Sequence, residues 1–280
     1  MIFHYLKIAF RNLCKHKTQN IISIIGLAVG LLCFCVCIYC SRFVESTDHC
    51  FANHDRIAEL NLYDGKADRY FSGSPVPLAE ELRTWALGET EAISSVTYPR
   101  ERPYYVELSP EKTLPYELET IEIDTCYNKI FTPEMVAGHW KMASQSLNSV
   151  ILSQSMAIKI FGNAESAIGK HMTLMRRLNT SPESTPKTGG IVYTIQAVMK
   201  DIPLNNSLDF MQNIDMLTVN DSEGLLQSPK RYNMTGANTY VLLSPQTTCT
   251  DLEKQFSKRD YTYTLYLSLI HISEPTRLGM

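Results

Sequence analysis

Two histidines near residue 50 have the residue types that best suit metal binding in this chain. His49 and His54 each stand next to an aspartate, Asp48 and Asp55 respectively, and imidazole and carboxylate groups are common metal ligands. A spacing of five residues, however, places the two rings on different faces of a helix. We therefore interpret both histidines as solvated side chains of a linker, and we predict no metal site.

The segment "FGNAESAIGKH", residues 161–171, invites comparison with a phosphate-binding loop. Such a loop needs four residues between its glycines, followed by Lys and then Ser or Thr, so that the backbone curls around the phosphates. Here six residues separate Gly162 from Gly169, and His171 follows Lys170, so we reject a nucleotide site. The chain also has no G-x-S-x-G motif and no spacing of carboxylates that suggests an acid–base pair. We expect no enzymatic activity, no catalytic residue and no cofactor bound by this chain.

The eight cysteines are divided by a long apolar run. One precedes the run, four lie in it or at its end, and three follow it: Cys14; Cys33, Cys35, Cys37 and Cys40; and Cys50, Cys126 and Cys249. The last three allow at most one disulfide, and the sequence leaves open whether any pair forms. We interpret the four in the run as small apolar side chains, not as a metal or redox site.

This apolar run decides in which compartment the other residues lie. Residues 18–41 are 24 consecutive uncharged residues. As a helix they span about 36 Å, and the hydrocarbon core of a bilayer is about 30 Å thick. A cleaved signal peptide would have an apolar region of only about 7–15 residues, followed by small residues at its cleavage site. We therefore predict a transmembrane helix over residues 18–43, in which Gly26 and Gly30 form a G-x-x-x-G motif that predicts close packing against another helix.

Basic residues before this helix set its predicted orientation. Lys7, Arg11, Lys15 and Lys17 precede the run, so the positive-inside rule places the N-terminus in the cytoplasm and residues from about 44 onward outside it. Residues 1–17 have apolar side chains on one helical face and basic ones on the other. This pattern predicts a cytoplasmic amphipathic helix that contacts membrane lipid and a partner subunit. The alternative is a basic segment that only sets topology.

Residues 44–266 are typical of one α+β extracytoplasmic domain of mixed strands and short helices, preceded by the amphipathic helix and one transmembrane α-helix. Residues 149–162 predict a strand, a serine cap at Ser153 or Ser155, and a helix that ends at Gly162. Residues 179–190 predict a loop. A net charge of −3 without a basic block argues against nucleic acid as a partner. Further strands are predicted at 56–63, 92–98, 103–108, 117–124, 190–203, 209–217 and 238–245, and further helices at 77–87 and 247–257.

Several segments together resemble the MacB/FtsX-like ABC transporter permeases. Over residues 4–257 they are "YLKIAFRNLCKHKTQNIISIIGLAVG", "FTPEMVAGHW", "SVILSQSMAIKIFGNAESAIGKHMTL", "YTIQAVMKDIPLNNSLDF" and "NTYVLLSP". The resemblance implies a first transmembrane helix, a periplasmic core domain and three further helices in the cell inner membrane. It also implies a permease dimer, a separate cytoplasmic ATPase subunit that binds the ATP, and a periplasmic adaptor as an optional partner. The expected function is efflux of peptides or drugs, or lipoprotein release.

The end of the sequence departs from this layout. Residues 267–277, "LSLIHISEPTR", resemble a translated sequencing-library transposon adapter. We expect native sequence to stop near Tyr266, residues 267–280 to be a non-native tail, and the chain to be a permease fragment. Two alternatives stay open: a non-transporting ABC-type regulator of a periplasmic cell-wall hydrolase, and a single-pass anchored binding or sensor module.

Overall fold

The computed structural model of the chain contains two units, residues 1–47 and residues 48–280. It describes residues 4, 15, 17–71, 73–85, 87–109, 112–174, 190–208, 211, 213–219, 226, 235–259 and 263–270. Most of the predicted amphipathic helix, including Lys7 and Arg11, lies outside these residues, as do most of the predicted loop at 179–190 and the tail from residue 271 onward.

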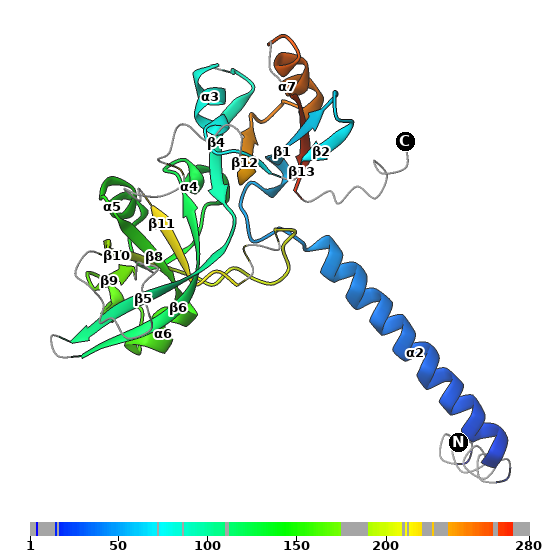
Figure 1. The fold of residues 1–280 in the computed structure, drawn as a ribbon. Coiled ribbons are helices and arrows are strands. Elements are labelled where there is room, and N and C mark those ends of the chain that lie inside the picture. The colour runs from blue at the N-terminus through cyan, green and yellow to red at the C-terminus, as the bar shows by residue number, and fades with distance from the viewer. Residues whose placement is uncertain are drawn as a thin grey trace. The chain divides into compact units, whose positions relative to one another are not determined.

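One long helix, α2 (Lys17–Glu45), makes up most of the described part of the first unit (Figure 1). Leu, Ile, Val and Cys side chains cover it on all sides, and none of its residues is buried within the chain. Its length and composition are sufficient to cross a membrane. Arg42 in the last turn has the charge that favours a helix C-terminus.

The second unit is built mainly from β-strands, with short helices packed against them (Figure 1). The strands are β1 (Ile57–Asp64), β2 (Arg69–Phe71), β3 (Ser74–Pro75), β4 (Thr90–Thr97), β5 (Arg100–Ser109), β6 (Lys112–Ile123), β7 (Met135–Gly138), β8 (Ser149–Ser153), β9 (His171–Leu174), β10 (Val192–Met199), β11 (Met216–Val219), β12 (Thr235–Leu243) and β13 (Thr264–Leu269). The helices are η1 (His54–Arg56), α3 (Leu78–Thr84), α4 (Tyr127–Phe131), α5 (Trp140–Gln145), α6 (Gln154–Phe161), η2 (Glu165–Ala167) and α7 (Cys249–Phe256).

Part of the second unit is a closed ring of strands. The order around it is β11-β8-β10-β9-β5-β6, and the ring closes because β11 pairs with β6 as well as with β8. The pairs β10–β8 and β11–β6 are parallel. Fully buried side chains from these strands, such as Tyr104, Val150, Ile195 and Met216, form one hydrophobic cluster with α6.

β1, β2, β3, β4, β12 and β13 form a second part, in which β12 lies between β4 and β1, whereas β7 pairs with β10 of the ring. Leu78 and Leu82 of α3 and Leu252 and Phe256 of α7 pack into its hydrophobic cluster. These helices are amphipathic because their apolar residues recur three to four positions apart. This part pairs with the ring of strands at one bridging position, Val96 of β4 opposite Ile123 of β6.

Asp124, the residue after β6, connects the two parts of the second unit. Its Oδ1 accepts hydrogen bonds from the Ser94 hydroxyl at 2.7 Å and from the Cys126 N–H at 2.9 Å. Its Oδ2 accepts the Ser95 N–H at 3.0 Å and pairs with the Arg83 guanidinium of α3. One carboxylate therefore links α3, β4 and the start of α4 next to the single bridging pair.

The α+β fold is confirmed, and the closest agreement with prediction is at residues 149–162. β8 ends at Ser153, whose hydroxyl oxygen accepts the Met156 N–H at 3.4 Å, so Ser153 and not Ser155 is the cap. α6 ends before Gly162, which has a φ of 86° and so adopts the left-handed conformation that glycine favours.

Several predicted boundaries differ from the structure; the strand predicted at 190–203, for example, is the shorter β10, Val192–Met199. The strand predicted at 209–217 is wrong at residues 211 and 213–215, because β11 begins only at Met216; residues 209, 210 and 212 lie outside the described residues. The end of the domain at Tyr266 stays a prediction; this position lies in β13, where Leu267 pairs with Leu60 of β1. The origin of residues 267–280 stays a prediction.

Candidate functional site

The residues that follow α2 are hydrogen-bonded to its last turn. Only Ser46 and Thr47 separate the end of α2 from the second unit. Their hydroxyls donate hydrogen bonds to the Phe43 carbonyl, at 3.1 and 3.3 Å, and their N–H groups donate to the carbonyls of Arg42 and Val44. Both connecting residues are therefore held against the last turn of the helix.

Asp48, the first residue of the second unit, is the centre of the candidate site. It is fully buried, and its φ of 64° lies in the left-handed region, which Asp tolerates better than most residues. Its N–H donates to the Asn205 carbonyl at 3.2 Å, and its Oδ1 accepts the Ser207 N–H at 2.7 Å. Its Oδ2 has no hydrogen-bond partner among the described residues. Because carboxylates are strong acceptors for backbone N–H groups, Asp48 fixes residues 205–207 in place.

Asp48 is bound by a segment that we call the strap, residues 200–208, which follows β10. Asn206 shapes the strap, because its Nδ2 donates to the Pro203 carbonyl at 2.5 Å and its Oδ1 accepts the Leu208 N–H at 3.0 Å. Near the other end of the strap, Asp201 Oδ1 accepts the Ser155 N–H at 3.1 Å, at the start of α6. The strap therefore connects residue 48 with both β10 and α6.

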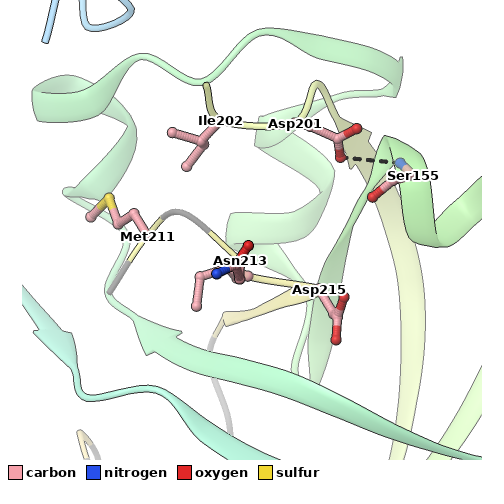
Figure 2. Close-up of a pocket in the computed structure, with 7 residues that line it drawn as sticks. Ser155, Asp201, Ile202, Met211, Asn213 and Asp215 are labelled. Carbon is pink, nitrogen blue, oxygen red and sulfur yellow. Dashed lines mark hydrogen bonds between the residues drawn. The ribbon is translucent and has the colours of Figure 1, made fainter. Parts of the chain in front are cut away.

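A cavity of about 190 Å³ borders the strap (Figure 2). Figure 2 shows the hydrogen bond between Asp201 and Ser155 at this cavity. Burial raises the pKa of the Asp215 carboxyl, although the Glu119 N–H that it accepts and the positive charge of Lys159 oppose the shift. Small-molecule sites usually measure about 300–1,000 Å³, so this cavity suits water or a small group. Its lining residues are Ser155, Asp201, Ile202, Met211, Asn213, Ile214 and Asp215.

A second cavity, of about 220 Å³, is more apolar. Burial raises the pKa of the Cys50 thiol, and the Asp48 carboxylate raises it further. Burial also raises the pKa of the Tyr127 hydroxyl. A thiol is nucleophilic only as thiolate, so neither group is activated for catalysis. The lining residues are Cys50, Phe51, Tyr127, Phe131, Pro133, Glu134, Lys200, Asp201, Ile202 and Pro203; Asp201 and Ile202 line both cavities, so the strap is a shared wall.

The structure brings His49 and His54 together, with ring centroids 4.5 Å apart. The prediction that they point in different directions is wrong, because residues 46–50 form a turn and not a helix. His54 Nε2 lies 3.3 Å from Asp55 Oδ1, and His54 Nδ1 lies 3.1 Å from the Phe51 carbonyl oxygen. Within the described part of the chain, no group of three or more His, Cys, Asp or Glu side chains is arranged to hold a metal ion.

The segment that resembles a phosphate-binding loop is a packed turn. The Gly169 N–H donates to the Ile195 carbonyl at 2.8 Å, and the Lys170 N–H donates to the Ala167 carbonyl at 3.1 Å. A phosphate-binding loop directs such N–H groups at its ligand. Here they bind other parts of the protein, so the role of this segment is structural.

The other predicted site residues lie in or next to α2. A Cβ atom added to Gly26 or Gly30 would meet no other atom within 4 Å, so packing of these glycines against a helix stays a prediction. Lys15 and Lys17 are helical and exposed. No disulfide joins any of the cysteines that the structure describes.

The role of Asp48 is not predicted from the sequence, where it stands out only as a neighbour of His49. The signal that could have revealed this role is the "KDIPLNNS" segment, residues 200–207. That motif is the strap.

Comparison with known proteins identifies the fold. A family model described as MacB-like periplasmic core domain matches residues 21–259. A structure described as a domain of a permease protein from Porphyromonas gingivalis is 21% identical, with a TM-score of 0.59, and the match covers 81% of this chain and 96% of that one. The periplasmic region of MacB from Actinobacillus actinomycetemcomitans is 13% identical, with a TM-score of 0.51, and the match covers 81% and 93%. A search of curated proteins found no match.

Proposed function

Since the chain belongs to the family of MacB-like periplasmic core domains, we propose that it is a permease subunit of an ABC transporter. In this proposal α2 crosses the cell inner membrane, the N-terminus lies in the cytoplasm, and residues from about 44 onward lie in the periplasm. A separate cytoplasmic ATPase subunit binds and hydrolyses the ATP, and the chain itself is not an enzyme. The transported substrates are peptides or drugs, or the process is lipoprotein release.

The observation that supports this proposal best is the family match over residues 21–259, which includes most of the apolar helix and most of the second unit. A permease must pass changes caused by a cytoplasmic ATPase across the membrane to its outer domain. Ser46 and Thr47 are both hydrogen-bonded to the end of α2, and the next residue, Asp48, is buried in the second unit. Only two residues therefore separate the apolar helix from the outer domain in the sequence.

The ATPase partner can be tested by affinity purification of the membrane-embedded protein. We expect an ABC ATPase to copurify in stoichiometric amount and to hydrolyse ATP. A double variant with Lys7→Glu and Arg11→Glu should reduce its recovery, because the basic cytoplasmic segment is expected to contact this subunit. Reversal of two exposed lysines of the second unit, Lys66→Glu and Lys141→Glu, is the matched control and should have no effect. Absence of any ABC ATPase, even after cross-linking in the membrane, would contradict the proposal.

The orientation can be tested separately with a membrane-impermeant maleimide. Cys50 is exposed and follows α2 by five residues, so the peptide that contains it should be labelled in intact spheroplasts, and Cys50→Ser should remove the label from that peptide. Cys14 precedes α2 and should be labelled only after the membrane is permeabilised. Labelling of Cys14 in intact spheroplasts would show the opposite orientation.

The proposed dimer can be tested through Gly26 and Gly30. Replacement of both by Ile should weaken cross-linking between two copies in the membrane, because bulky side chains prevent close approach of helix backbones. Unchanged cross-linking would place the contact between copies elsewhere.

A further inference from the structure

We propose that three tyrosines of the second unit, Tyr63, Tyr70 and Tyr266, form a binding site for a quaternary ammonium group. The proposal concerns side chains that neither the candidate site nor the proposed function uses, so it does not depend on that function. All three tyrosines lie at or before residue 266, within the sequence that we expect to be native.

Three hydrogen-bonded strands place the tyrosines on one face of the sheet. Tyr63 of β1 pairs with Tyr70 of β2, and Tyr266 of β13 pairs with Asn61 of β1. Side chains alternate between the two faces of a strand, so the three tyrosines share a face. β1 lies between β2 and β13 here (Figure 1). On the opposite face Leu62 packs into the hydrophobic cluster of α3 and α7, which supports the strands from behind.

The three rings are close together and inclined to one another. The ring centroid of Tyr63 lies 4.9 Å from that of Tyr70 and 6.3 Å from that of Tyr266, and the last two centroids are 6.2 Å apart. The ring planes of these pairs meet at 43°, 73° and 55°, respectively, so no pair is stacked face to face. A cation about 4 Å above the plane of the centroids would lie within about 6 Å of each, the range of cation–π attraction.

The rings are accessible, and within the described residues no Lys or Arg side chain lies over any of them. Tyr70 is 71% exposed, and the other two tyrosines are partly exposed. Arg69 is next to Tyr70 in the sequence, but its guanidinium lies over the Phe71 ring, 4.4 Å from the centroid. Exposed aromatic surface of this kind commonly marks an interaction site, and these ring faces are open to a cation from outside.

Asp68 supplies a negative charge beside the rings. Its Oδ1 accepts the hydrogen bond of the Tyr63 hydroxyl at 2.7 Å, and this hydrogen bond raises the pKa of that hydroxyl. Asp68 belongs to the turn between β1 and β2, in which Asp64 Oδ1 accepts the N–H groups of Lys66 and Ala67. The turn therefore holds the carboxylate at the rings, where it attracts the same positive charge as the negative ring faces do.

The chemistry of the site favours a quaternary ammonium over a primary one. A primary ammonium is strongly hydrated and donates three hydrogen bonds, which need acceptors to replace its water. Aromatic faces offer no such acceptors. A quaternary ammonium donates no hydrogen bond, and clusters of aromatic rings recognise it through cation–π attraction. A free quaternary amine and the headgroup of a choline lipid share this chemistry.

Binding can be tested with choline and with 3,3-dimethylbutan-1-ol, which has the same shape without the charge. The full chain is purified in a maltoside detergent, which is uncharged and contains no ammonium group. The dissociation constant of each compound is measured by saturation-transfer difference NMR of its methyl protons. We expect choline to bind about fivefold or more tightly than the neutral compound. Equal affinity for the two compounds, or no binding of choline, would overturn the proposal.

Substitutions then locate the site. Tyr70→Leu should weaken choline binding by about two- to fivefold, and Tyr70→Leu combined with Tyr266→Leu by about fivefold or more. Tyr70→Phe keeps the ring and should bind choline within about twofold of the unaltered chain. Tyr105→Leu alters a partly exposed tyrosine of β5 and is the matched control. The urea midpoint reports whether each variant is folded; if the double variant is not, Tyr70→Leu decides alone. Unchanged choline binding in the folded variants would refute the site.

A water-soluble, short-chain phosphatidylcholine distinguishes the two sources of the group. Competition with choline at a concentration about tenfold lower than that of choline would support a lipid headgroup as the ligand. Competition at a similar concentration would support the free amine. The phosphatidylethanolamine of the same chain length carries a primary ammonium and should not compete; equal competition by it would contradict recognition of a quaternary ammonium.

Discussion

Replacement of Asp124 by Ala should strongly destabilise the second unit. The carboxylate accepts four hydrogen bonds, from Ser94, Ser95, Cys126 and Arg83. A donor left without a partner costs about 1–3 kcal/mol when it is buried. The Arg83 and Asp124 side chains are 34% and 18% exposed, so water will replace part of the lost bonding. We therefore expect the free energy of unfolding to fall by about 2–4 kcal/mol, less than the sum of four separate losses.

Urea unfolding followed by tryptophan fluorescence is a suitable assay for this change. The two tryptophans of the chain, Trp85 and Trp140, both lie in the second unit, so the signal does not report on α2. Trp85 packs against Phe256 close to the end of α3, the helix that carries Arg83. With a slope of about 3 kcal/mol per molar urea, the midpoint should fall by about 1 M.

Glu134→Gln is the matched control, because the ion pair of Glu134 with Lys200 is exposed, with side-chain exposures of 72% and 58%. Such a surface pair contributes about 0–1 kcal/mol. The loss in urea midpoint for Asp124→Asn should lie between the losses for Asp124→Ala and Glu134→Gln, since the amide keeps one acceptor oxygen. If Asp124→Ala lowers the midpoint no more than Glu134→Gln does, then Asp124 does not connect the two parts of the second unit.

Three further substitutions test other features of the second unit by the same assay. Burial raises the pKa of the Glu59 carboxyl, so the folded state holds this proton more tightly than the unfolded state; the resulting stability is complete below the ordinary pKa of about 4.3 and is lost as pH rises through the raised value. Glu59→Gln should therefore raise the urea midpoint above that of the unaltered chain, and the gain should be larger at pH 7 than at pH 5. A gain that is the same at both pH values would contradict this. Gly138 has a φ of 72°, and a Cβ there would collide with the Gln196 carbonyl, so Gly138→Ala should destabilise by about 2 kcal/mol or more; a neutral effect would mean that β7 and β10 separate easily. Thr248 caps α7 through the Asp251 N–H, so Thr248→Ala should cost about 1 kcal/mol, and a loss below a few tenths would show that the capping box contributes little.

The elements that the sequence predicts well are those with local signals. The serine cap at Ser153 and the left-handed Gly162 mark the two ends of α6 within ten residues of each other, and the alternation of residues marks β1, β10 and β12. The short strands β2, β3, β7 and β9 and the helices α4 and α5 have no predicted counterpart, because they are shorter than the window over which a period can be recognised.

The candidate site could not be predicted because its partners are distant in sequence. Asp48 and Ser207 are 159 positions apart, and nothing near Asp48 distinguishes it from other polar residues that follow an apolar helix. The parallel pairing of β11 with β6 is equally non-local, so the closed ring of strands is also invisible to local patterns. The family resemblance located the motif of the strap, but not the residue that it binds.

The pairing of β1 with β12 also bears on the order of events during synthesis. Residues 57–60 of β1 pair with residues 239–242 of β12. This pairing cannot form until most of the chain has been synthesised. At about 5–20 residues per second, this wait is on the order of 10–40 s. During it, residues 57–60 of β1 are an unpaired apolar edge open to wrong partners, although residues 62–64 can already pair with β2. A newly made chain should therefore depend on chaperones for longer than its size alone suggests, whereas the ring of strands can assemble before β12 is made.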